Sequence, residues 1–398
     1  EFSAPRVLNF RNTNDPFYIT GINIVDDFLI WTDGKSEPKK IHIPRSKAGT
    51  NPNGSFHTKL FLEDPNDLGT YVDANTLSSE LDNGGLTNGS GIDSYLKEEH
   101  ITIIKKAPTA APTLSMSDTD RHGVVDTSCN FSFTNDFEEP LEVDVVQTIQ
   151  IDSSVTNFRS NDVLIFTLQE AFDIKIKAIF ISYENENGEK VLNSTNKIRI
   201  KLITAPVVGV TMTNWDLSLE RGRPLFELKL VRFGYRYKYE DGEYSSFSPW
   251  SELAFIPDDF GYRITKGHNT GMVNTLRELA IKDFIPYRIP LDVKAVDILY
   301  KSTDSANVYI AETIEKGSEK WELFTPNGDN DIEIKTGELS ITSEMIHRAL
   351  PSNQLLRSWD NVPRYALAQE VIGNRLTFAN YVQGYEIGGP ISLTQRIA

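Results

Sequence analysis

Histidine is the first residue type to test for chemistry in this 398-residue chain, because imidazole serves both as a metal ligand and as a general acid or base. The chain has six: His42, His57, His100, His122, His268 and His347. No two of them stand four residues apart, as a helical pair of zinc ligands would, and none belongs to a His-Glu-x-x-His sequence. The spacing gives no support to a zinc hydrolase, and we expect neither a metal site nor a cofactor.

Nucleophilic catalysis has equally little support in the sequence. Cys129 is the only cysteine, and it lies in a polar stretch without a nearby histidine. The chain has no Gly-x-Ser-x-Gly elbow, no Walker loop and no dinucleotide fingerprint, since its glycines stand in Asn/Asp turns. We therefore predict no catalytic and no cofactor-binding residues, and we expect that the protein is not an enzyme. A single cysteine also permits neither an intrachain disulfide nor a multi-cysteine metal site.

Carboxylates are numerous, with 56 Asp and Glu residues against 40 Lys and Arg. The run Asp329-Asn330-Asp331-Ile332-Glu333 has some features of a calcium loop, but it lacks the glycine and the terminal bidentate Glu of an EF-hand, so a hairpin turn is favoured. A pair of carboxylates suited to glycoside hydrolysis, about 5–10 Å apart in a cleft, is not visible in a linear sequence. A glycan hydrolase therefore stays open as a third class of function.

The stretch from Val231 to Pro257 predicts the element around which the chain is organised. Its first part alternates apolar and aromatic residues with basic ones: Val231, Phe233, Tyr235, Tyr237 and Tyr239 against Arg232, Arg236 and Lys238. Asp241-Gly242 then suits a tight turn, because Gly takes a positive φ without steric cost. Tyr244 to Phe255 predicts a return strand that is broken locally at Ser248-Pro249. An aromatic hairpin of this kind needs another sheet packed on it.

The formal net charge of the chain is −16, and such a surface repels nucleic acid and anionic lipid unless cations gather in one patch. The sequence shows no such patch, whereas the stretch from His122 to Asp173 holds ten acidic residues against Arg159 alone. No apolar run approaches the ~20 residues of a membrane span. Because the chain begins with Glu1, without Met or a secretory signal pattern, we expect it to be part of a longer protein or a processed product.

The length predicts more than one domain, and changes in composition divide the chain into three. We expect residues 1–106 to form an N-terminal β segment, propeller-like or a plain meander, with a long Asn/Gly-rich loop. The proline-containing linker 105–112 then leads into a fibronectin-III-like sandwich over residues 107–257, with a small β module inserted at about 136–205. Residues 258–398 are expected to be mostly β with a short helix. The predicted fold class is mainly β and multidomain, with fibronectin-III-like or β-sandwich modules and propeller-like or meander β segments at the two ends.

Local patterns give further predictions within these regions. We expect a strand at Ile101–Ile104, a hairpin turn at Glu184–Gly188, either a helix or a strand at Gly271–Ala280, and a helix with a serine N-cap at Ser343–Leu350. The last strands, within Val371–Tyr385, repeat the pattern of Ile24–Ile43. The first and last segments are therefore expected to pair in one propeller-like sheet.

Three stretches of the chain resemble one family of proteins. They are Ile19–Ile24 with Leu29–Gly34 and Glu37–Ile41; Tyr235–Ser245 with Phe247–Pro249; and Asn353–Arg357 with Trp359–Pro363, Ala366–Glu370 and Asn374–Leu376. Together, and in this order, they resemble virion structural proteins of the short-tailed crAss-like phages, and in particular tail-barrel proteins of the muzzle or nozzle type. Members of this family are usually longer, and the chain has Ser358 and Ala379 where Pro and Gly are expected.

The resemblance implies a structural subunit of a phage tail that assembles into a homo-oligomeric ring, expected to be sixfold, around the DNA-ejection channel. It also implies contact with other tail proteins, and a place in the virion after assembly in the host bacterial cytoplasm. DNA would pass without specific binding, because an acidic wall repels phosphate groups, and we expect the acidic stretch 122–173 to face the lumen. A lone cysteine agrees with assembly in a reducing cytosol.

The alternative function is that of a glycan-binding or adhesive surface protein, such as a receptor-binding protein. Sugar rings stack on exposed aromatic side chains. Exposed Trp215, Trp250 or Trp321 on a sheet face would therefore support this alternative, and buried ones would count against it.

Overall fold

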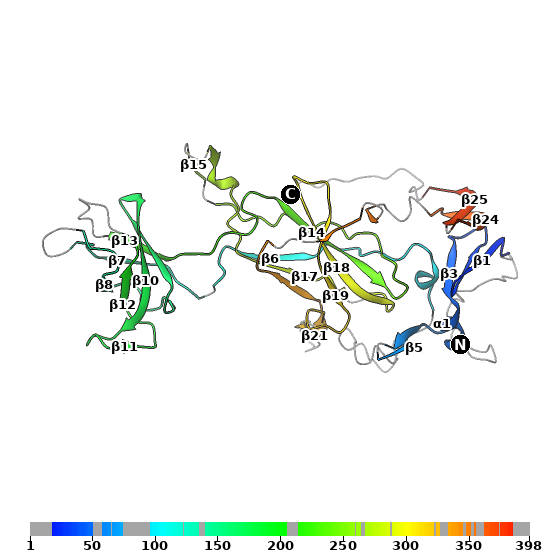
Figure 1. The fold of residues 1–398 in the computed structure, drawn as a ribbon, viewed down its shortest axis with the longest axis horizontal. Coiled ribbons are helices and arrows are strands. Elements are labelled where there is room, and N and C mark those ends of the chain that lie inside the picture. The colour runs from blue at the N-terminus through cyan, green and yellow to red at the C-terminus, as the bar shows by residue number, and fades with distance from the viewer. Residues whose placement is uncertain are drawn as a thin grey trace. The chain divides into compact units, whose positions relative to one another are not determined.

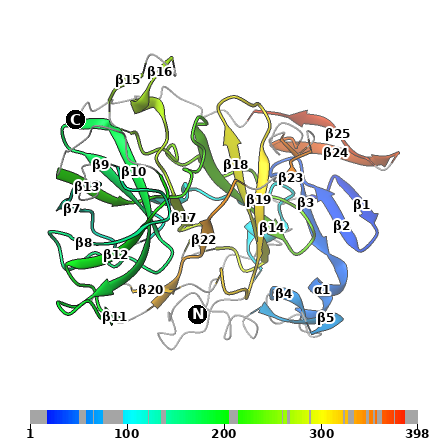
Figure 2. The same ribbon diagram turned by 60° about the vertical axis from the view of Figure 1, so that its left-hand side comes forward.

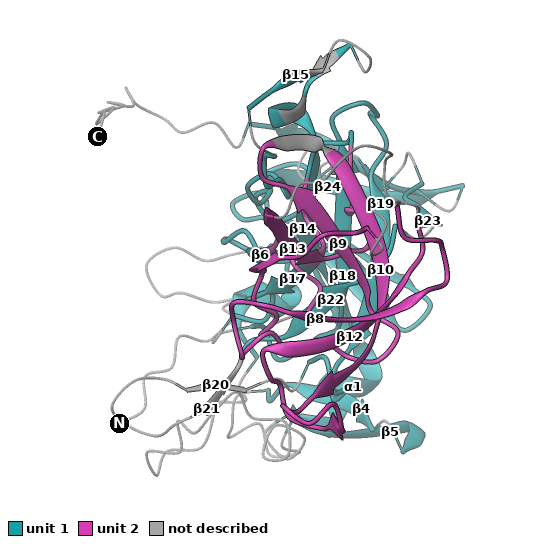
Figure 3. Cartoon of the chain, turned by 90° about the vertical axis from the view of Figure 1, so that its left-hand side faces the viewer, with its two compact units in different colours: residues 1–116, 228–274, 279–398 teal, residues 117–227, 275–278 magenta. Residues whose placement is uncertain are grey.

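The structure is a computed structural model. It describes residues 18–50, 58–64, 66–74, 96–121, 123–134, 140–204, 214–258, 260–263, 267–286, 289–321, 324–326, 333–344, 348–351, 354–355, 362–373 and 375–384. Strands make up 47% of these residues and helices 5%, which confirms the predicted mainly-β class. The chain folds into two compact units, shown in Figure 3: unit 1 consists of residues 1–116, 228–274 and 279–398, and unit 2 of residues 117–227 and 275–278.

A four-stranded antiparallel sheet forms the centre of unit 1 (Figure 1). Its strands, in spatial order, are β14 (Val231–Tyr239), β18 (Val293–Ser302), β19 (Tyr309–Glu315) and β23 (Arg348–Ala349). The predicted strand over 231–239 is confirmed, and its four aromatic side chains are buried. Gly234 and Arg236, which alternate with them, are buried as well. Both faces of β14 are therefore covered.

The return strand expected over 244–255 is not a regular strand, although the segment does run along the outer edge of β14. Three serines at three-residue spacing each meet one residue of β14; the pairs are Ser245 with Tyr237, Ser248 with Tyr235, and Ser251 with Phe233. In each pair the serine N–H donates to the β14 carbonyl, and the serine Oγ accepts from the β14 N–H, at distances of 2.8–3.0 Å. In a regular strand pair, a backbone carbonyl of the neighbouring strand would accept the β14 N–H. Here three residues of the return segment lie alongside two residues of β14, so the ladder of carbonyls is out of step. The serine Oγ accepts the N–H in place of the carbonyl.

The return segment lies close to β14 at Gly234. A Cβ at this residue would lie 3.2 Å from a ring carbon of Trp250 and 3.3 Å from the Ser248 Oγ. The Lys301 ammonium lies 4.8 Å from the centre of the same indole, in cation–π geometry. The missing side chain at Gly234 therefore lets the indole cover this edge of the sheet.

An ion pair is buried in the face of the central sheet. Arg236 on β14 and Asp297 on β18 are opposite each other in register and are 1% and 2% exposed. The Arg236 Nε and Nη2 atoms each lie 2.9 Å from Asp297 Oδ2, and Oδ1 accepts from the Thr313 hydroxyl at 2.7 Å. Arg236 also donates to Gln354 at 3.0 Å, and its guanidinium lies 3.8 Å from the centre of the Tyr244 ring. These contacts satisfy both charges, as their burial requires.

The first and last described elements of unit 1 lie against each other. They are β1 (Gly21–Val25), β2 (Phe28–Thr32) and β3 (Lys39–His42), which form a meander followed by helix α1 (Ile43–Ala48), and the hairpin of β24 (Tyr365–Ile372) and β25 (Arg375–Val382). Gly34 N donates to the Ala366 carbonyl at 3.0 Å, and Gln369 Nε2 donates to the Ile30 carbonyl at 2.7 Å. The predicted association of the two segments is confirmed, but the prediction of one shared sheet is wrong, since they form two separate sheets.

The remaining elements outside the sheet of unit 2 are short. They are β4 (Phe61–Asp64), β5 (Asp67–Asp73), α3 (Glu98–Ile101), β6 (Thr113–Ser117), β15 (Tyr262–Arg263), β16 (His268–Asn269), the 3-10 helix η1 (Thr270–Met272), β17 (Glu278–Lys282), β20 (Phe324–Pro326), β21 (Glu333–Lys335) and β22 (Glu338–Ile341). The strand expected at Ile101–Ile104 is wrong, because a helical turn ends at Ile101 and buries that side chain. The helix expected at Ser343–Leu350 is also wrong, since Arg348 and Ala349 pair with β19. For Gly271–Ala280 the strand alternative holds from Glu278 onward.

Unit 2 is an antiparallel sheet curled into a half-barrel, whose strands can be followed in Figure 2. In spatial order the strands are β7 (Thr127–Asn130), β13 (Asn214–Leu219), β9 (Val163–Leu168), β10 (Ala171–Glu184), β12 (Lys197–Leu202) and β8 (Val146–Gln150), with β11 (Lys190–Val191) paired to the end of β10. The two edges of the sheet meet at one end, where Cys129 bridges Ile151. The predicted turn at Glu184–Gly188 is confirmed, because Glu184 pairs with Lys190.

One hydrophobic core fills the inside of the half-barrel. Alternate residues of β9 and β12 point into it and are buried, as the period of two in a strand requires. The Phe133 ring packs edge-to-face on Phe166 and Trp215, with ring centroids 5.2 Å and 5.1 Å apart. The Trp215 indole N–H donates to the Phe131 carbonyl at 2.8 Å, so its polar atom is satisfied.

The serine contacts along β14 predict a specific loss of stability. Ser248→Ala is expected to lower the free energy of unfolding by about 1–3 kcal/mol, because it leaves the buried Tyr235 N–H without its acceptor. Chemical denaturation followed by circular dichroism measures the change. Ser246→Ala is the matched control, since the Ser246 Oγ is buried without a hydrogen-bond partner and its removal costs little. Equal losses in the two variants would contradict this account of the β14 edge.

The buried ion pair predicts a second loss, which a further substitution should reverse. Arg236→Met leaves the Asp297 carboxylate buried and unpaired, so we expect a loss of about 3–5 kcal/mol in unfolding free energy. The double variant R236M/D297L removes both charges and should recover much of that loss, as measured in the same denaturation experiment. A double variant no more stable than Arg236→Met would show that the packing of the arginine stem, not the unpaired charge, accounts for the effect.

Candidate functional site

Cys129, the one thiol of the chain, lies in the wall of the half-barrel and is 2% exposed. Burial raises the pKa of this thiol to about 12, and the nearby Asp152 and Asp216 carboxylates add to the effect. A thiol that stays protonated is a poor nucleophile. Cys129 is therefore unsuited to nucleophilic catalysis.

The histidines are not brought together as ligands where the structure describes them. Within the described residues, no group of three or more His, Cys, Asp or Glu side chains is placed to hold a metal ion. His57, His122 and His347 lie outside those residues, and so does the greater part of the run Asp329–Glu333, including its first four positions. No helix in the described part of the chain is long and apolar enough to cross a membrane.

A small cavity of about 30 Å³ lies in unit 1, where α1 and α3 approach the turn that follows β14. Its lining includes His42, His100, Glu240 and Asp292. A cavity of this size has room for about one or two water molecules, so it excludes an organic substrate.

Three ion pairs surround this cavity and join segments that are distant in sequence. They are Arg45 with Asp241, Lys40 with Glu243 at 2.5 Å, and Lys105 with Asp292 at 3.6 Å. The Lys105 side chain is 2% exposed and also donates to the His100 carbonyl at 3.0 Å. Sequence patterns could not reveal these pairs, because Arg45 and Asp241 are 196 positions apart. The charges hold α1, α3 and the ends of β14 and β18 together.

Both histidines at the cavity use Nδ1 to accept a backbone N–H. His42 is the N-cap of α1 and accepts from Arg45 N at 3.4 Å, while His100 accepts from Lys97 N at 3.0 Å at the start of α3. Burial lowers the pKa of both imidazoles from their ordinary value near 6.5, and for His42 the Arg45 guanidinium adds to the effect. Each ring is thus held neutral and acts as a helix cap at neutral pH.

Three glutamates line an open depression of about 500 Å³ in unit 1. Glu37, Glu98 and Glu99 line it together with Lys35 and Arg364. Burial raises the pKa of Glu37, and the neighbouring Glu98 charge adds to this effect. A carboxyl group of raised pKa is what a general acid in glycoside hydrolysis requires.

The second carboxylate that such a reaction needs is engaged elsewhere. Glu98 lies 3.1 Å from Lys39, and Glu99 lies 2.9 Å from Lys106. Although burial would raise the pKa of Glu99, the hydrogen bond and the charge of Lys106 lower it overall. Both carboxylates therefore serve ion pairs, which leaves Glu37 without an unpaired partner in this depression.

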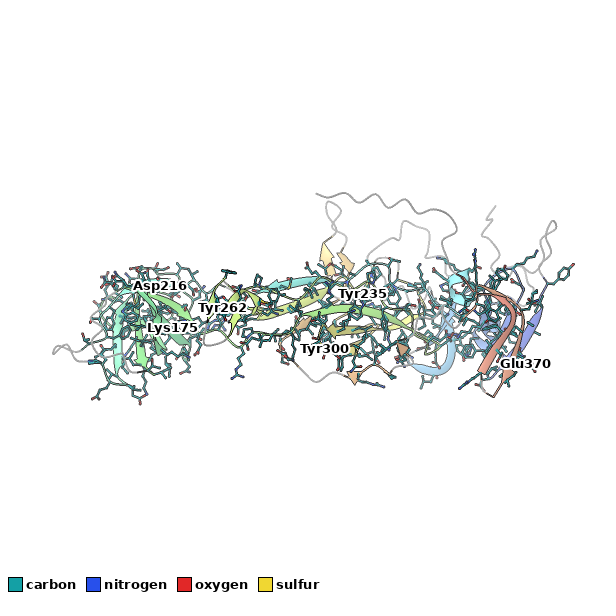
Figure 4. All side chains as sticks on the ribbon, turned by 90° about the horizontal axis from the view of Figure 1, so that it is seen from above. Lys175, Asp216, Tyr235, Tyr262, Tyr300 and Glu370 are labelled. Carbon is teal, nitrogen blue, oxygen red and sulfur yellow. The ribbon has the colours of Figure 1, made fainter. Side chains whose placement is uncertain are left out.

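The tryptophans proposed for glycan stacking are not exposed on a sheet face. Trp215 and Trp321 are 1% and 2% exposed, and Trp250 is partly buried with Lys301 over its ring. Exposed aromatic side chains occur instead at Phe260, which precedes β15 and is 88% exposed, and at Tyr262, the first residue of β15, which is 66% exposed. The position of Tyr262 can be seen in Figure 4.

Comparison of the chain with protein-family profiles, with curated protein sequences and with solved structures finds no match.

The two histidine caps predict a loss of stability in mild acid. Because their pKa is lower in the folded chain than the ordinary 6.5, the unfolded chain binds more protons below about pH 6.5. The free energy of unfolding should therefore fall as the pH drops below 6.5 and continue to fall until the folded histidines are themselves protonated. Urea denaturation at a series of pH values between 7.5 and 5 measures this trend.

The variant H42N/H100N provides the control for this prediction. The Asn side-chain carbonyl keeps an acceptor for each backbone N–H but does not titrate. The variant keeps every charged group that acts on the two histidines. These groups are Arg45, Asp241, Asp27 and Glu63 for His42, and Asp292, Glu99, Lys105 and Lys97 for His100. Glu37 and Glu240, whose pKa is raised by burial, stabilise the fold as the pH falls, so the difference between parent and variant isolates the histidines. Parallel pH profiles would rule out the histidine caps as the cause.

Proposed function

We propose that the chain is a structural subunit of a phage tail, of the muzzle or nozzle type of crAss-like phages. Copies of it assemble into a ring around the DNA-ejection channel, with the sixfold symmetry that the resemblance implies, and contact other tail proteins. Its place is the virion tail, after assembly in the host bacterial cytoplasm. Support from the sequence comes from the three blocks of resemblance, and support from the structure comes chiefly from strand β1.

Strand β1 presents its apolar side chains outward. Ile22 and Ile24 are 55% and 66% exposed, whereas the Asn23 side-chain oxygen between them is buried without a hydrogen-bond partner. On the adjoining β24–β25 hairpin, Ile372 and Tyr381 are 58% and 52% exposed. An exposed apolar surface with a polar group beneath it is unfavourable in a free monomer and favourable when another protein covers it. This inverted strand is the observation that carries an assembly function.

Buried charges in unit 1 are used to connect chain segments. Arg236 and Asp297 join β14 to β18, and the ion pairs around the cavity join α1 and α3 to the ends of these strands. A subunit of a conduit must keep its shape under load, and such contacts resist local opening. We propose that the work of the protein is mechanical, without a catalytic site and without a cofactor.

The negative charge of the chain supports its role in a channel for DNA. A net charge of −16 repels a polyanion, so DNA passes without adhering. We propose that the acidic stretch 122–173 lies toward the lumen, where Glu142 and Glu170 are exposed carboxylates of that stretch.

We propose a more specific fold for the chain as well. Fibronectin-III-like or β-sandwich modules with propeller-like or meander ends agree with the curled sheet of unit 2 and with the three-stranded meander β1–β3. The domain boundaries at 106/107 and 257/258, and the module inserted at about 136–205, stay predictions.

Glycan binding is the second candidate function, and one observation favours it. Phe260 and Tyr262 expose aromatic rings that could stack on sugars, although the buried Trp215 and Trp321 count against a larger aromatic platform. The two aromatic residues equally suit contact with another tail protein.

Electron microscopy of purified virions is the test of the ring. We expect the chain to occupy a symmetric ring on the tail axis, with density contacting the outer face of β1. The variant Ile24→Asp should reduce ring formation at least about tenfold, because it places a charge in an interface core. Leu68→Asp, at a residue that is 81% exposed on the β4–β5 hairpin, is the matched control and should assemble normally. Free monomers absent from the particle would contradict the proposal.

The glycan alternative is tested separately by binding to capsular polysaccharide of the host. If the tail-subunit proposal is right, the F260A/Y262A variant and the parent show the same weak retention on immobilised polysaccharide. A loss of retention of about tenfold or more in the variant would favour the adhesive function, since stacking on an aromatic ring contributes on that scale.

A further inference from the structure

A short projection of unit 1 exposes three large apolar side chains. It consists of β15, β16 and η1, and Figures 1 and 3 show it standing out from the rest of that unit. Phe260 and Tyr262 are largely exposed, and Met272 is 70% exposed. Apolar side chains that gather on a surface in this way mark a contact with another molecule. We call these three residues the apolar projection.

Hydrogen bonds to one side chain fix the shape of the projection. The Asn269 Oδ1 accepts from Gly261 N at 3.2 Å and from Gly271 N at 2.9 Å. Gly261 follows Phe260, and Gly271 precedes Met272, so the asparagine ties together the segments that carry the exposed side chains. A surface that is ordered before it binds loses less conformational entropy on binding. The projection is therefore prepared for docking.

The meander of β1, β2 and β3 also exposes apolar side chains, and they lie on one of its two faces. Ile22 is opposite Trp31 in register, and Ile24 is opposite Leu29, so these four side chains share that face. Ile22 and Ile24 are more than half exposed, Leu29 is partly exposed, and Trp31 is buried. We call this apolar surface the meander face.

The opposite face of the meander is covered by the β24–β25 hairpin. Gly21 and Asn23 alternate with the exposed isoleucines and therefore lie on that opposite face. A Cβ at Gly21 would lie 3.0 Å from the Gln369 N of β24, and the Asn23 side-chain oxygen is buried. The hairpin thus packs on the side of Gly21 and Asn23, and it leaves the meander face exposed.

We propose that the apolar projection of one copy docks on the meander face of a second copy of this chain. This inference rests on the proposed ring and names the two surfaces through which neighbours meet. Both surfaces belong to unit 1, and both are exposed in the same chain, so neither covers the other. A head-to-tail contact uses two different surfaces of each copy, and it closes into a ring when the rotation between copies allows.

The area of the projection agrees with a contact between proteins. A phenylalanine or tyrosine side chain buries about 150–250 Å² when it is fully covered, so Phe260 and Tyr262 together offer roughly 300 Å² at their present exposure. A standard interface buries about 800 Å² on each partner. The two rings supply roughly 40% of one side of such an interface, and Met272 adds to this. Large anchors of this kind carry most of the binding energy at an interface.

A second copy of the chain suits the projection better than a sugar does. Methionine is enriched with aromatic residues at protein interfaces, and its flexible thioether adapts to an apolar surface. A sugar would find only a weak hydrogen-bond acceptor in Met272. Every copy carries one projection and one meander face, so a closed ring covers all of them and leaves none exposed to water.

Photocrosslinking in the assembled tail tests the contact in the full-length chain. The photoreactive residue p-benzoylphenylalanine in place of Tyr262 keeps an aromatic ring there and, on irradiation, inserts into C–H bonds of the surface that it touches. We expect the main crosslinked peptide to come from residues 21–32 of another copy, identified by mass spectrometry. A mixture of isotope-labelled and unlabelled chains distinguishes a crosslink between copies from one within a copy. The same photoreactive residue in place of Leu192, which is 95% exposed in unit 2, is the control and should not crosslink to residues 21–32.

Exchange of an apolar contact for a charged one is the second test. The variants I24D and Y262K each place one charge in the contact, so each should lower the association constant at least about tenfold in sedimentation velocity, or about 1.4 kcal/mol. The double variant I24D/Y262K brings the two opposite charges together in every contact. Its association constant should return to within about threefold of the parent at low salt. Leu192→Lys is the control and should assemble like the parent, and thermal unfolding checks that each variant is folded.

The outcomes separate this inference from the proposed function. If rings form but the residue at position 262 crosslinks elsewhere, or if I24D/Y262K assembles no better than either single variant, the docking contact is wrong and the tail-ring proposal stands. If F260A/Y262A assembles like the parent but loses retention on polysaccharide, the projection is a sugar site and the inference is overturned. If the chain is absent from virions and stays monomeric, both proposals are overturned.

Discussion

The backbone groups on the outer edge of β14 must find partners away from water, because this strand is covered on both faces. The chain meets that requirement with Ser245, Ser248 and Ser251, each of which supplies a donor from its N–H and an acceptor from its Oγ. The spacing of three residues is essential, because it places one serine beside every second residue of β14, namely Tyr237, Tyr235 and Phe233. A second regular strand would have done the same with carbonyl groups, but Pro249 in this segment has no N–H to offer a ladder. The edge of the central sheet is thereby closed without a neighbouring strand.

Charge is distributed differently in the two units, and the difference has a physical basis. In unit 1 the important charges are buried, and each has a partner from a distant segment, such as Arg236 with Asp297. Such pairs add little net stability over apolar residues, but they strongly penalise any arrangement that separates the partners. In unit 2 the core is mainly apolar, and the cations of β12 lie on the outer wall. Unit 1 uses electrostatics to fix its own elements, and unit 2 presents electrostatics to its surroundings.

The sequence predicts those features that arise from short-range patterns. Alternation identified β14 correctly, and the turn at Glu184–Gly188 follows from the preference of Asn and Gly for tight turns. The same approach failed at Ser343–Leu350, where the N-cap pattern is present but pairing with β19 makes Arg348 and Ala349 a strand. Sequence patterns also failed for the return segment. A segment whose serine Oγ atoms accept the hydrogen bonds of a strand does not show the alternation of apolar and polar residues that identifies a strand. The cavity with its ion pairs was out of reach, since no local rule links Arg45 to Asp241. The inward position of Asn23 could not be predicted either. The sequence Ile-Asn-Ile shows that the residues alternate, but it does not show which of the two faces of the strand is buried.

The burial of Cys129 has a practical consequence for study of the assembly. Its thiol is enclosed by the core of the half-barrel and held protonated, so alkylating and maleimide reagents will find no reactive sulfur in the native chain. Any cysteine introduced on the surface becomes the sole labelling site without prior removal of the natural one. Fluorophores or spin labels can therefore be attached at a chosen point, and the separation between neighbouring copies can be read directly from energy transfer or dipolar coupling.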